Sequence, residues 1–284
     1  MEPNQPSRTA FGAALHRAAH QILDHPPLFA DPLALKIIGP EAEAGLRSGR
    51  SWHGRRSNAS NALRTRIATR SRLAEDTLVH AYADGLRQYV LLGAGLDTFA
   101  YRANIAGLAI FEVDHPATQA WKRSRLAEAQ IPLPANVRYV PIDFDRQDLG
   151  EVLATAGFEF ARPAVIAWLG VTQYLSREAV MKTLGFVAQH MARGSSIVFD
   201  YGVPVEGLKP DQRARFFEVA TRVASLGEPF RSFFAPGPLA EELRELGFSS
   251  VEDFDSTALN ALYFSDRSDG LSLPARGHIM RARI

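Results

Sequence analysis

The spacing of apolar and polar positions divides the chain into two parts near residue 87. Before that point apolar residues recur at helical intervals, as over residues 11–23. A short helix is expected over 33–38, with Asp31 as its N-cap and Gly39 at its end, and a long helix over 59–86. The polar segment 47–58 is expected to be a loop. This pattern predicts a helical N-terminal extension, residues 1–87.

After residue 87, short apolar runs alternate with helical patterns, which predicts an α/β fold with a doubly wound, mainly parallel sheet. The final two runs have no full crossover helix between them. We therefore expect the last strand of a seven-stranded sheet to be antiparallel at one edge, with residues 88–284 as one compact unit. The expected strands are 88–93, 108–113, 137–142, 164–169, 195–200, 249–254 and 278–283, and the expected helices are 97–103, 116–129, 147–156, 176–191, 209–226 and 239–246.

Composition excludes several classes of function. The chain has no cysteine, which excludes disulfides, thiolate metal sites and a cysteine nucleophile. Its 32 basic and 31 acidic residues give a net charge of +1, so no overall field favours nucleic acid or a membrane surface. The start of the chain lacks the pattern of a signal peptide, no apolar stretch is long enough to span a bilayer, and the histidines lack the spacing of a metal site. We expect a cytoplasmic protein that acts on a small molecule without a metal.

The segment Tyr89–Thr98 carries the strongest chemical signal. An apolar run ends in the turn Gly93-Ala94-Gly95, and Asp114 follows about one strand–helix–strand unit later, where a carboxylate can bind ribose hydroxyls. The third glycine of a nicotinamide fingerprint is missing. Asp97 instead brings a negative charge to the place where a pyrophosphate would dock, which favours a cationic cofactor, S-adenosyl-L-methionine. Asp97 is also a common type of first-turn acid in a helix.

Further polar residues follow the third and fourth predicted strands. Asp143 and Phe144 suit an adenine pocket, although an acid here can equally cap the next turn. Thr172, Gln173 and Tyr174 suit a wall that faces the substrate, although Tyr174 can equally be a packing residue.

Two kinds of basic residue complete the candidates. The long helix carries Arg64, Arg66, Arg70 and Arg72, which form either a solvated face or a site for a cofactor carboxylate. His115, next to Asp114, is the histidine considered as a base, and the other seven are expected to be surface or packing residues.

These segments together resemble the leucine carboxyl methyltransferase family, in particular its bacterial branch, which includes polyketide O-methyltransferases. The resemblance rests on Leu92–Thr98, Phe111–Pro116 and Leu169–Leu175. It implies a class I methyltransferase fold in which the N-terminal helical extension, residues 1–87, acts as a lid. It further implies a glycine turn behind the methionine moiety and ribose binding by Asp114. It also implies adenine binding by Asp143 and Phe144 and carboxylate binding by Arg70, with Arg66 as the competing choice. The chain departs from the family at Leu169, where a glutamate of the cofactor and active-site wall is usual.

The expected function is methylation of a carboxylate, phenol or hydroxyl oxygen of a small molecule such as a polyketide. A carboxylate needs no base, whereas a phenol does, with His115 and Tyr174 as candidates; the catalytic residues stay open. Two alternatives remain: an NAD(P)-dependent oxidoreductase and a non-catalytic binding protein. Several aromatic residues are expected either to line an acceptor pocket or to belong to the core: Phe29, Trp52, Phe216, Phe217, Phe230, Phe233 and Phe234.

Overall fold

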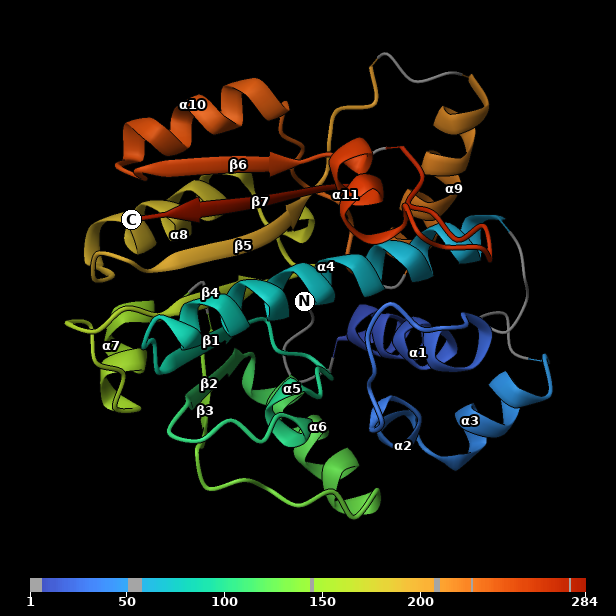
Figure 1. Cartoon of the computed structure of the whole chain (residues 1–284), viewed down its shortest axis with the longest axis horizontal. Helices are drawn as coiled ribbons and strands as arrows, with labels where there is room; N and C mark the ends of the chain where they lie inside the picture. Colours follow the sequence, from blue (N-terminus) through green and yellow to red (C-terminus); the bar gives the residue numbers. More distant parts are fainter. Residues whose placement is uncertain (1–6, 51–57, 144–145, 207–209, 226, 276) are drawn as a thin grey trace.

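A single mixed β-sheet organises the molecule. The computed structural model describes residues 7–50, 58–143, 146–206, 210–225, 227–275 and 277–284. Within these residues the sheet has seven strands in the order β3-β2-β1-β4-β5-β7-β6, and β7 runs opposite to the other six (Figure 1). The strands are β1 Gln88–Leu92, β2 Ala109–Asp114, β3 Val137–Pro141, β4 Val165–Trp168, β5 Ser196–Tyr201, β6 Ser250–Phe254 and β7 His278–Arg283.

The predicted strands and the antiparallel direction of the last strand are confirmed, but its place at the edge is wrong. β7 pairs with β5 on one side and with β6 on the other, so β6 is the edge strand. The residues explain this order. Ile279 and Met280 of β7 point to opposite faces and both are buried, as in an interior strand. In β6, Glu252 is exposed, which an edge strand tolerates.

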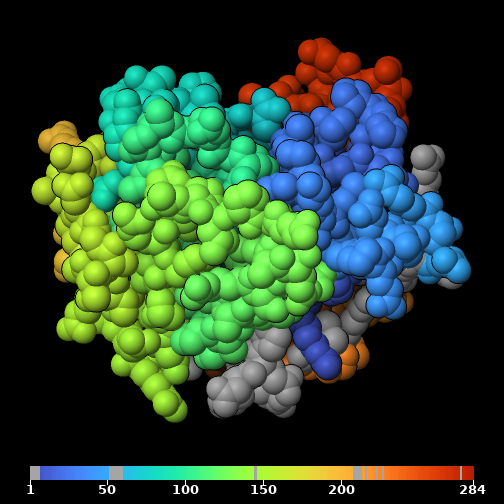
Figure 2. Space-filling model, turned by 90° about the horizontal axis from the view of Figure 1, so that it is seen from below, coloured from blue at the N-terminus to red at the C-terminus, as the bar shows by residue number. Residues whose placement is uncertain are grey.

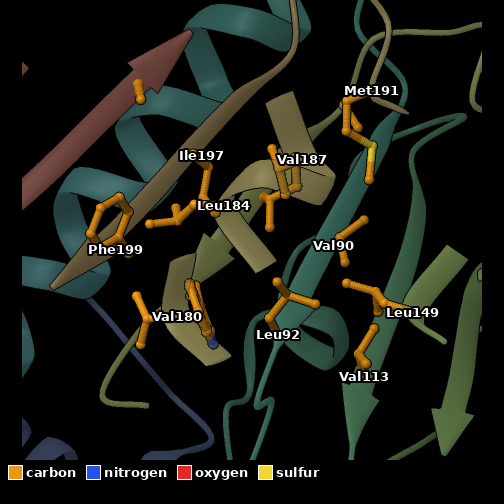
Figure 3. Packing of buried hydrophobic residues seen from close by; sticks show 14 of the residues in the cluster. Val90, Leu92, Val113, Leu149, Val180, Leu184, Val187, Met191, Ile197 and Phe199 are labelled. Atoms are coloured by element: carbon orange, nitrogen blue, oxygen red, sulfur yellow. The ribbon is translucent and has the colours of Figure 1, made fainter. Parts of the chain in front are cut away.

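Helices cover both faces of the sheet. Val90 and Leu92 of β1 face one hydrophobic cluster, formed with α7 Leu149–Thr155, α8 Arg177–His190 and α10 Pro236–Leu246 (Figure 3). Tyr89 and Leu91 face the opposite cluster, formed with α4 Asn58–Ala83, α5 Phe99–Arg102 and α11 Ser256–Tyr263. Because successive side chains of a strand point to opposite faces, β1 is buried throughout.

The remaining helices surround one end of the sheet. A third hydrophobic cluster joins α1 Arg8–Leu23, α2 Ala34–Ile38 and α3 Pro40–Arg47 to α6 Pro116–Glu128. Figure 2 shows the blue N-terminal helices packed directly beside the green residues of this region. The two other elements are the 3-10 turn η2 Thr172–Tyr174 and α9 Pro210–Ser225. The division of the chain near residue 87 into an extension and a core stays a prediction. Helix α4, which belongs to the predicted extension, packs against strands β4 and β5 of the sheet.

Two helices were not expected from the sequence. Gly39 has a φ of 85° and ends α2 as predicted, but Pro40 then occupies the first turn of α3, where a missing N–H costs nothing. The segment between β6 and β7, where no full crossover helix is expected, contains the short helix α11, which follows the N-cap Asp255. Both helices are only eight residues long, and such short elements carry little periodic signal.

Candidate active site

A cavity of about 1650 Å³ opens at the carboxyl ends of the parallel strands. It lies where β1 and β4 are neighbours although they are distant in sequence, the switch point at which open α/β sheets bind ligands. Ligand pockets commonly enclose about 300–1,000 Å³, so this cavity has room for two ligands. Its walls come from the loops after β1 to β5, from α1, α4 and α9, and from the segments 227–233 and 273–277, within which Arg276 lies outside the described residues.

The glycine turn after β1 forms the floor of the cavity. Gly93 has a φ of 71°, and a Cβ atom there would lie 2.4 Å from Cγ2 of Val171. Gly95 has a φ of 45°, and a Cβ there would lie 3.2 Å from Cβ of Ala10 in α1. The first position therefore excludes a side chain, and the second allows the helical lid to approach the turn closely.

Asp114, at the end of β2, holds the same turn. One carboxylate oxygen accepts from the Gly95 N–H at 2.6 Å and the other from the His115 N–H at 2.7 Å. Burial raises the pKa of Asp114, and these two backbone bonds oppose that shift. Glu112, two residues before Asp114 on β2, does not share this site, because its carboxylate pairs with Lys122 of α6 at 2.8 Å and does not line the cavity.

Asp97 lines the cavity, but its charge is already matched. Its carboxylate accepts from the Phe99 N–H at 2.7 Å, and Arg17 of α1 lies 3.1 Å away. Burial alone would raise the pKa of Asp97, yet the nearby cations, Arg17 first, lower it. The negative charge predicted at this turn is therefore paired with a cation of the chain itself. Asp97 precedes the N-cap Thr98 of α5, so it is not in the first turn of that helix as expected, and its pair with Arg17 ties the lid to the glycine turn.

Two arginines one turn apart on α4 share one buried carboxylate, Asp200 at the end of β5. Arg70 donates to Asp200 at 3.0 Å, and Arg66 lies 3.6 Å from the same oxygen. Both arginines line the cavity, and Arg70 packs so closely on Gly170 that a Cβ there would lie 2.5 Å from the guanidinium. The pair therefore brings one more positive than negative charge to this wall. Trp168 of β4 pairs with Phe199 of β5, so the residues that follow them, Leu169 and Asp200, lie side by side. Asp200 thus places a carboxylate next to Leu169 from the neighbouring strand.

The segment after β3 contributes one described candidate. Asp143 lines the cavity beside the fully buried Ile142, and its backbone N–H donates to Gln147 at 2.9 Å. Arg146 lies 3.5 Å from its carboxylate. Phe144 lies outside the described residues.

Only some of the residues predicted to face the substrate after β4 line the cavity. Leu169, Gln173 and Tyr174 line the cavity, and the side-chain oxygen of Gln173 has no hydrogen-bond partner among the described residues. Thr172 does not line it: this residue is fully buried and donates to the backbone oxygen of Asp200 at 2.7 Å. The prediction of Thr172 as a substrate residue is wrong, because the 3-10 turn points its side chain inward.

A scan against protein-family models matches residues 10–188 to the leucine carboxyl methyltransferase family. The chain belongs to this family. It is 30% identical to Bacillus subtilis YktD over 302 aligned residues, 99% of each chain, and 35% identical to a Mycolicibacterium smegmatis protein over 209 residues, 70% of this chain and 69% of that one. Both relatives are named as S-adenosyl-L-methionine-dependent methyltransferases.

The fold agrees with this assignment. A Thermobifida fusca structure named as a methyltransferase superposes with a TM-score of 0.58, at 20% identity over 99% of this chain and 96% of that one. The chain is thus an S-adenosyl-L-methionine-dependent methyltransferase, and the nicotinamide alternative falls. Among the helices of the described residues, none has the length and apolar character to cross a membrane. The described residues also hold no group of acids and histidines arranged for a metal ion.

The candidate bases of this methyltransferase are poorly placed to take a proton. His115 is the N-cap of α6, and its Nδ1 accepts from the Ala117 N–H at 3.2 Å, so a neutral ring carries its proton on Nε2. Burial raises the pKa of the Tyr174 phenol, which stays protonated at neutral pH. His16, expected to be a surface or packing residue, is almost fully buried and lines the cavity from α1.

Sequence reasoning missed two charged residues of this methyltransferase. Asp200 ends a parallel strand, and the rule that selected Asp114 and Asp143 would have found it. Arg17 had no such signal, because its pairing with Asp97 and Asp31 joins segments distant in the chain.

Proposed function

We propose that this methyltransferase methylates a carboxylate oxygen of a small apolar molecule. The observation that carries the proposal is the hydrogen bond from Ala117 to His115 Nδ1, which occupies the basic nitrogen of the principal candidate base. A carboxylate acceptor is already ionised at neutral pH and needs no base. The family name, leucine carboxyl methyltransferase, supports the same class of acceptor.

The cavity fits S-adenosyl-L-methionine by its shape and by the chemistry of its walls. The positive φ and close Val171 contact of Gly93 leave a bare backbone turn against which the methionine moiety can pack. Asp114 is held in place by two backbone N–H groups and keeps lone pairs for the ribose hydroxyls. Arg70 would bind the carboxylate of the cofactor, and Asp143 would accept from adenine.

When bound, the cofactor supplies an electrophilic methyl group carried on a sulfonium sulfur. The residues of the chain supply position and a dry environment. Arg17 pairs with Asp97 beside the glycine turn and holds α1 over the site, and Glu228 accepts from the Thr9 N–H at 3.1 Å between two segments that line the cavity. Such closure excludes water and orients the two reactants, which is the main task in an in-line displacement.

A phenolic or hydroxyl oxygen is the second candidate acceptor. It is favoured by His16, whose imidazole lies on the cavity wall and is a residue type that can accept the phenol proton. Hydroxyl methylation then depends on the ionisation of a base, whereas carboxylate methylation does not.

The test is release of S-adenosylhomocysteine with matched carboxylic acids, phenols and alcohols, each measured across about pH 6 to 9. We expect turnover with carboxylic acids and a kcat/KM that changes little over this range, because acids with a pKa near about 4 are ionised throughout. Turnover confined to phenols, rising with pH, would replace this proposal by the second candidate. Binding of S-adenosyl-L-methionine without turnover on any member would indicate a non-catalytic binding protein.

A further inference from the structure

Four aromatic side chains meet at one end of the cavity, between η2, α9 and the segment 227–233. We name Tyr174, Phe216, Phe230 and Phe233 the aromatic pocket, and all four line the cavity. The Phe230 ring centroid lies 5.6 Å from that of Tyr174 and 6.0 Å from that of Phe216, and Phe216 and Phe233 are 5.7 Å apart. These are favourable distances for aromatic contact.

The neighbouring aromatic residues do not share this position. Phe217 is 52% exposed and does not line the cavity, while Phe234 and Phe29 are buried in hydrophobic clusters on opposite faces of the sheet. Trp52 lies outside the described residues. Gly202, directly after β5, makes room for the pocket: a Cβ there would lie 3.0 Å from the Phe233 ring. The tertiary structure thus selects some of the aromatic residues for a ligand and assigns others to packing.

A cation stands beside the aromatic pocket. Arg66 lies one turn before Arg70 on α4, lines the same cavity as the aromatic pocket and interacts electrostatically with Tyr174. Arg70 is committed to Asp200 at 3.0 Å with 12% of its side chain exposed, whereas Arg66 is 3.6 Å from Asp200 with 30% exposed. Asp200 balances only one of the two charges. The amino-acid end of the cofactor carries an ammonium as well as a carboxylate, so its binding to Arg70 leaves the excess positive charge of the pair in place. The Arg66 guanidinium donates to the backbone oxygen of Tyr201 at 3.3 Å and keeps further N–H groups for a second anion.

We propose that the methyl acceptor is a carboxylic acid bearing an aromatic ring. Its ring lies among Tyr174, Phe216, Phe230 and Phe233, and Arg66 holds its carboxylate. This inference rests on the proposed carboxylate methylation and names the acceptor class. One carboxylate oxygen forms a bond to the methyl carbon while the carbon–sulfur bond breaks. The bonding pair stays on sulfur, which becomes a neutral thioether, and no proton moves.

The ring requirement is tested with acceptors that differ only in aromaticity. 3-Phenylpropanoate and 3-cyclohexylpropanoate carry the same carboxylate on rings of similar size. We expect kcat/KM to favour the phenyl compound by between about two- and tenfold, the range of one aromatic contact. Equal or higher efficiency with the cyclohexyl compound would overturn the inference, while turnover of 3-phenylpropanol in place of both acids would overturn the proposed carboxylate methylation as well.

The binding residues are tested by calorimetry, independently of turnover. The measurement is the Kd of 3-phenylpropanoate for protein saturated with S-adenosylhomocysteine. Arg66→Gln is expected to weaken this binding between about 10- and 100-fold, as for the loss of a hydrogen bond to a charged group. The Kd of S-adenosylhomocysteine itself is expected to change less than threefold, because Arg70 remains. A Kd of 3-phenylpropanoate that is unchanged in R66Q would overturn the role of Arg66.

Adjacent phenylalanines of α9 provide a matched control. Phe216→Ala removes a ring of the pocket and is expected to raise the KM for 3-phenylpropanoate at least about fivefold. Phe217→Ala removes an exposed ring of the same helix that contacts Phe216 at 5.6 Å but does not line the cavity, and it is expected to change the KM less than about twofold. Equal effects of the two substitutions, with thermal unfolding confirming that both proteins are folded, would refute the position of the acceptor ring.

Discussion

Gly93 provides the sharpest test of the site geometry, because two separate costs oppose any side chain there. Its φ of 71° lies in the left-handed region, which costs an L-residue about 1–2 kcal/mol. An alanine Cβ would also lie 2.4 Å from Cγ2 of Val171, roughly 1 Å inside ordinary contact. Val171 is β-branched and turns away only with difficulty, so overpacking adds about 1–3 kcal/mol. We expect Gly93→Ala to lower the free energy of unfolding by about 2–5 kcal/mol in total.

The assay is urea unfolding, together with calorimetric titration of S-adenosyl-L-methionine at a temperature where the variant is folded. Gly270→Ala is the matched control, since Gly270 has the same φ of 71° with nothing within 4 Å of the added Cβ. The Gly270→Ala variant should therefore lose only the free energy of placing an alanine at a positive φ. Val171→Ala in the Gly93→Ala background removes the overlapping methyl group. The double variant should therefore be destabilised by about 1–3 kcal/mol less than the sum of the two single substitutions.

The Gly93 reasoning fails under either of two results. Equal destabilisation by Gly93→Ala and Gly270→Ala would show that Val171 does not restrict the turn. Unchanged cofactor affinity in Gly93→Ala would show that the turn does not shape the cofactor site.

Three further outcomes are expected. Burial by itself would raise the pKa of Asp24, but the hydrogen bonds from His20 and Arg64 lower this pKa from 3.8 to about 2. The ionised carboxylate therefore contributes about 2 kcal/mol of stability above pH 3.8, and this contribution is lost as the pH falls towards 2. Urea unfolding of Asp24→Asn should show this difference from the unchanged chain at pH 7 and a smaller one near pH 3; a constant difference would contradict it. Asp114→Asn should raise the Kd of S-adenosyl-L-methionine about 10- to 100-fold by calorimetry, whereas tight binding in this variant would remove Asp114 from the site. Thr172→Val should cost about 1 kcal/mol in unfolding while leaving the acceptor KM unchanged, and a raised KM would return Thr172 to the substrate wall.

The sequence by itself determined the strands, the glycine turn and the class of cofactor. These depend on local information: apolar runs mark buried strands, and a glycine turn followed by an acid at the next strand end marks a nucleoside site. Gly93, Gly95, Asp114 and Arg70 all line the cavity accordingly. The same rule, applied at the end of β5, would have included Asp200.

Only the tertiary structure decided how the charges are matched and which side chains face the ligands. Arg17 neutralises Asp97, Asp200 pairs with Arg66 and Arg70, and these pairs join segments that no sequence pattern connects. Likewise, a 3-10 turn directs Thr172 inward while its neighbours line the cavity. Periodicity describes a residue within its own element, whereas pairing and exposure depend on which other elements pack against it, and that is settled only when the chain is folded.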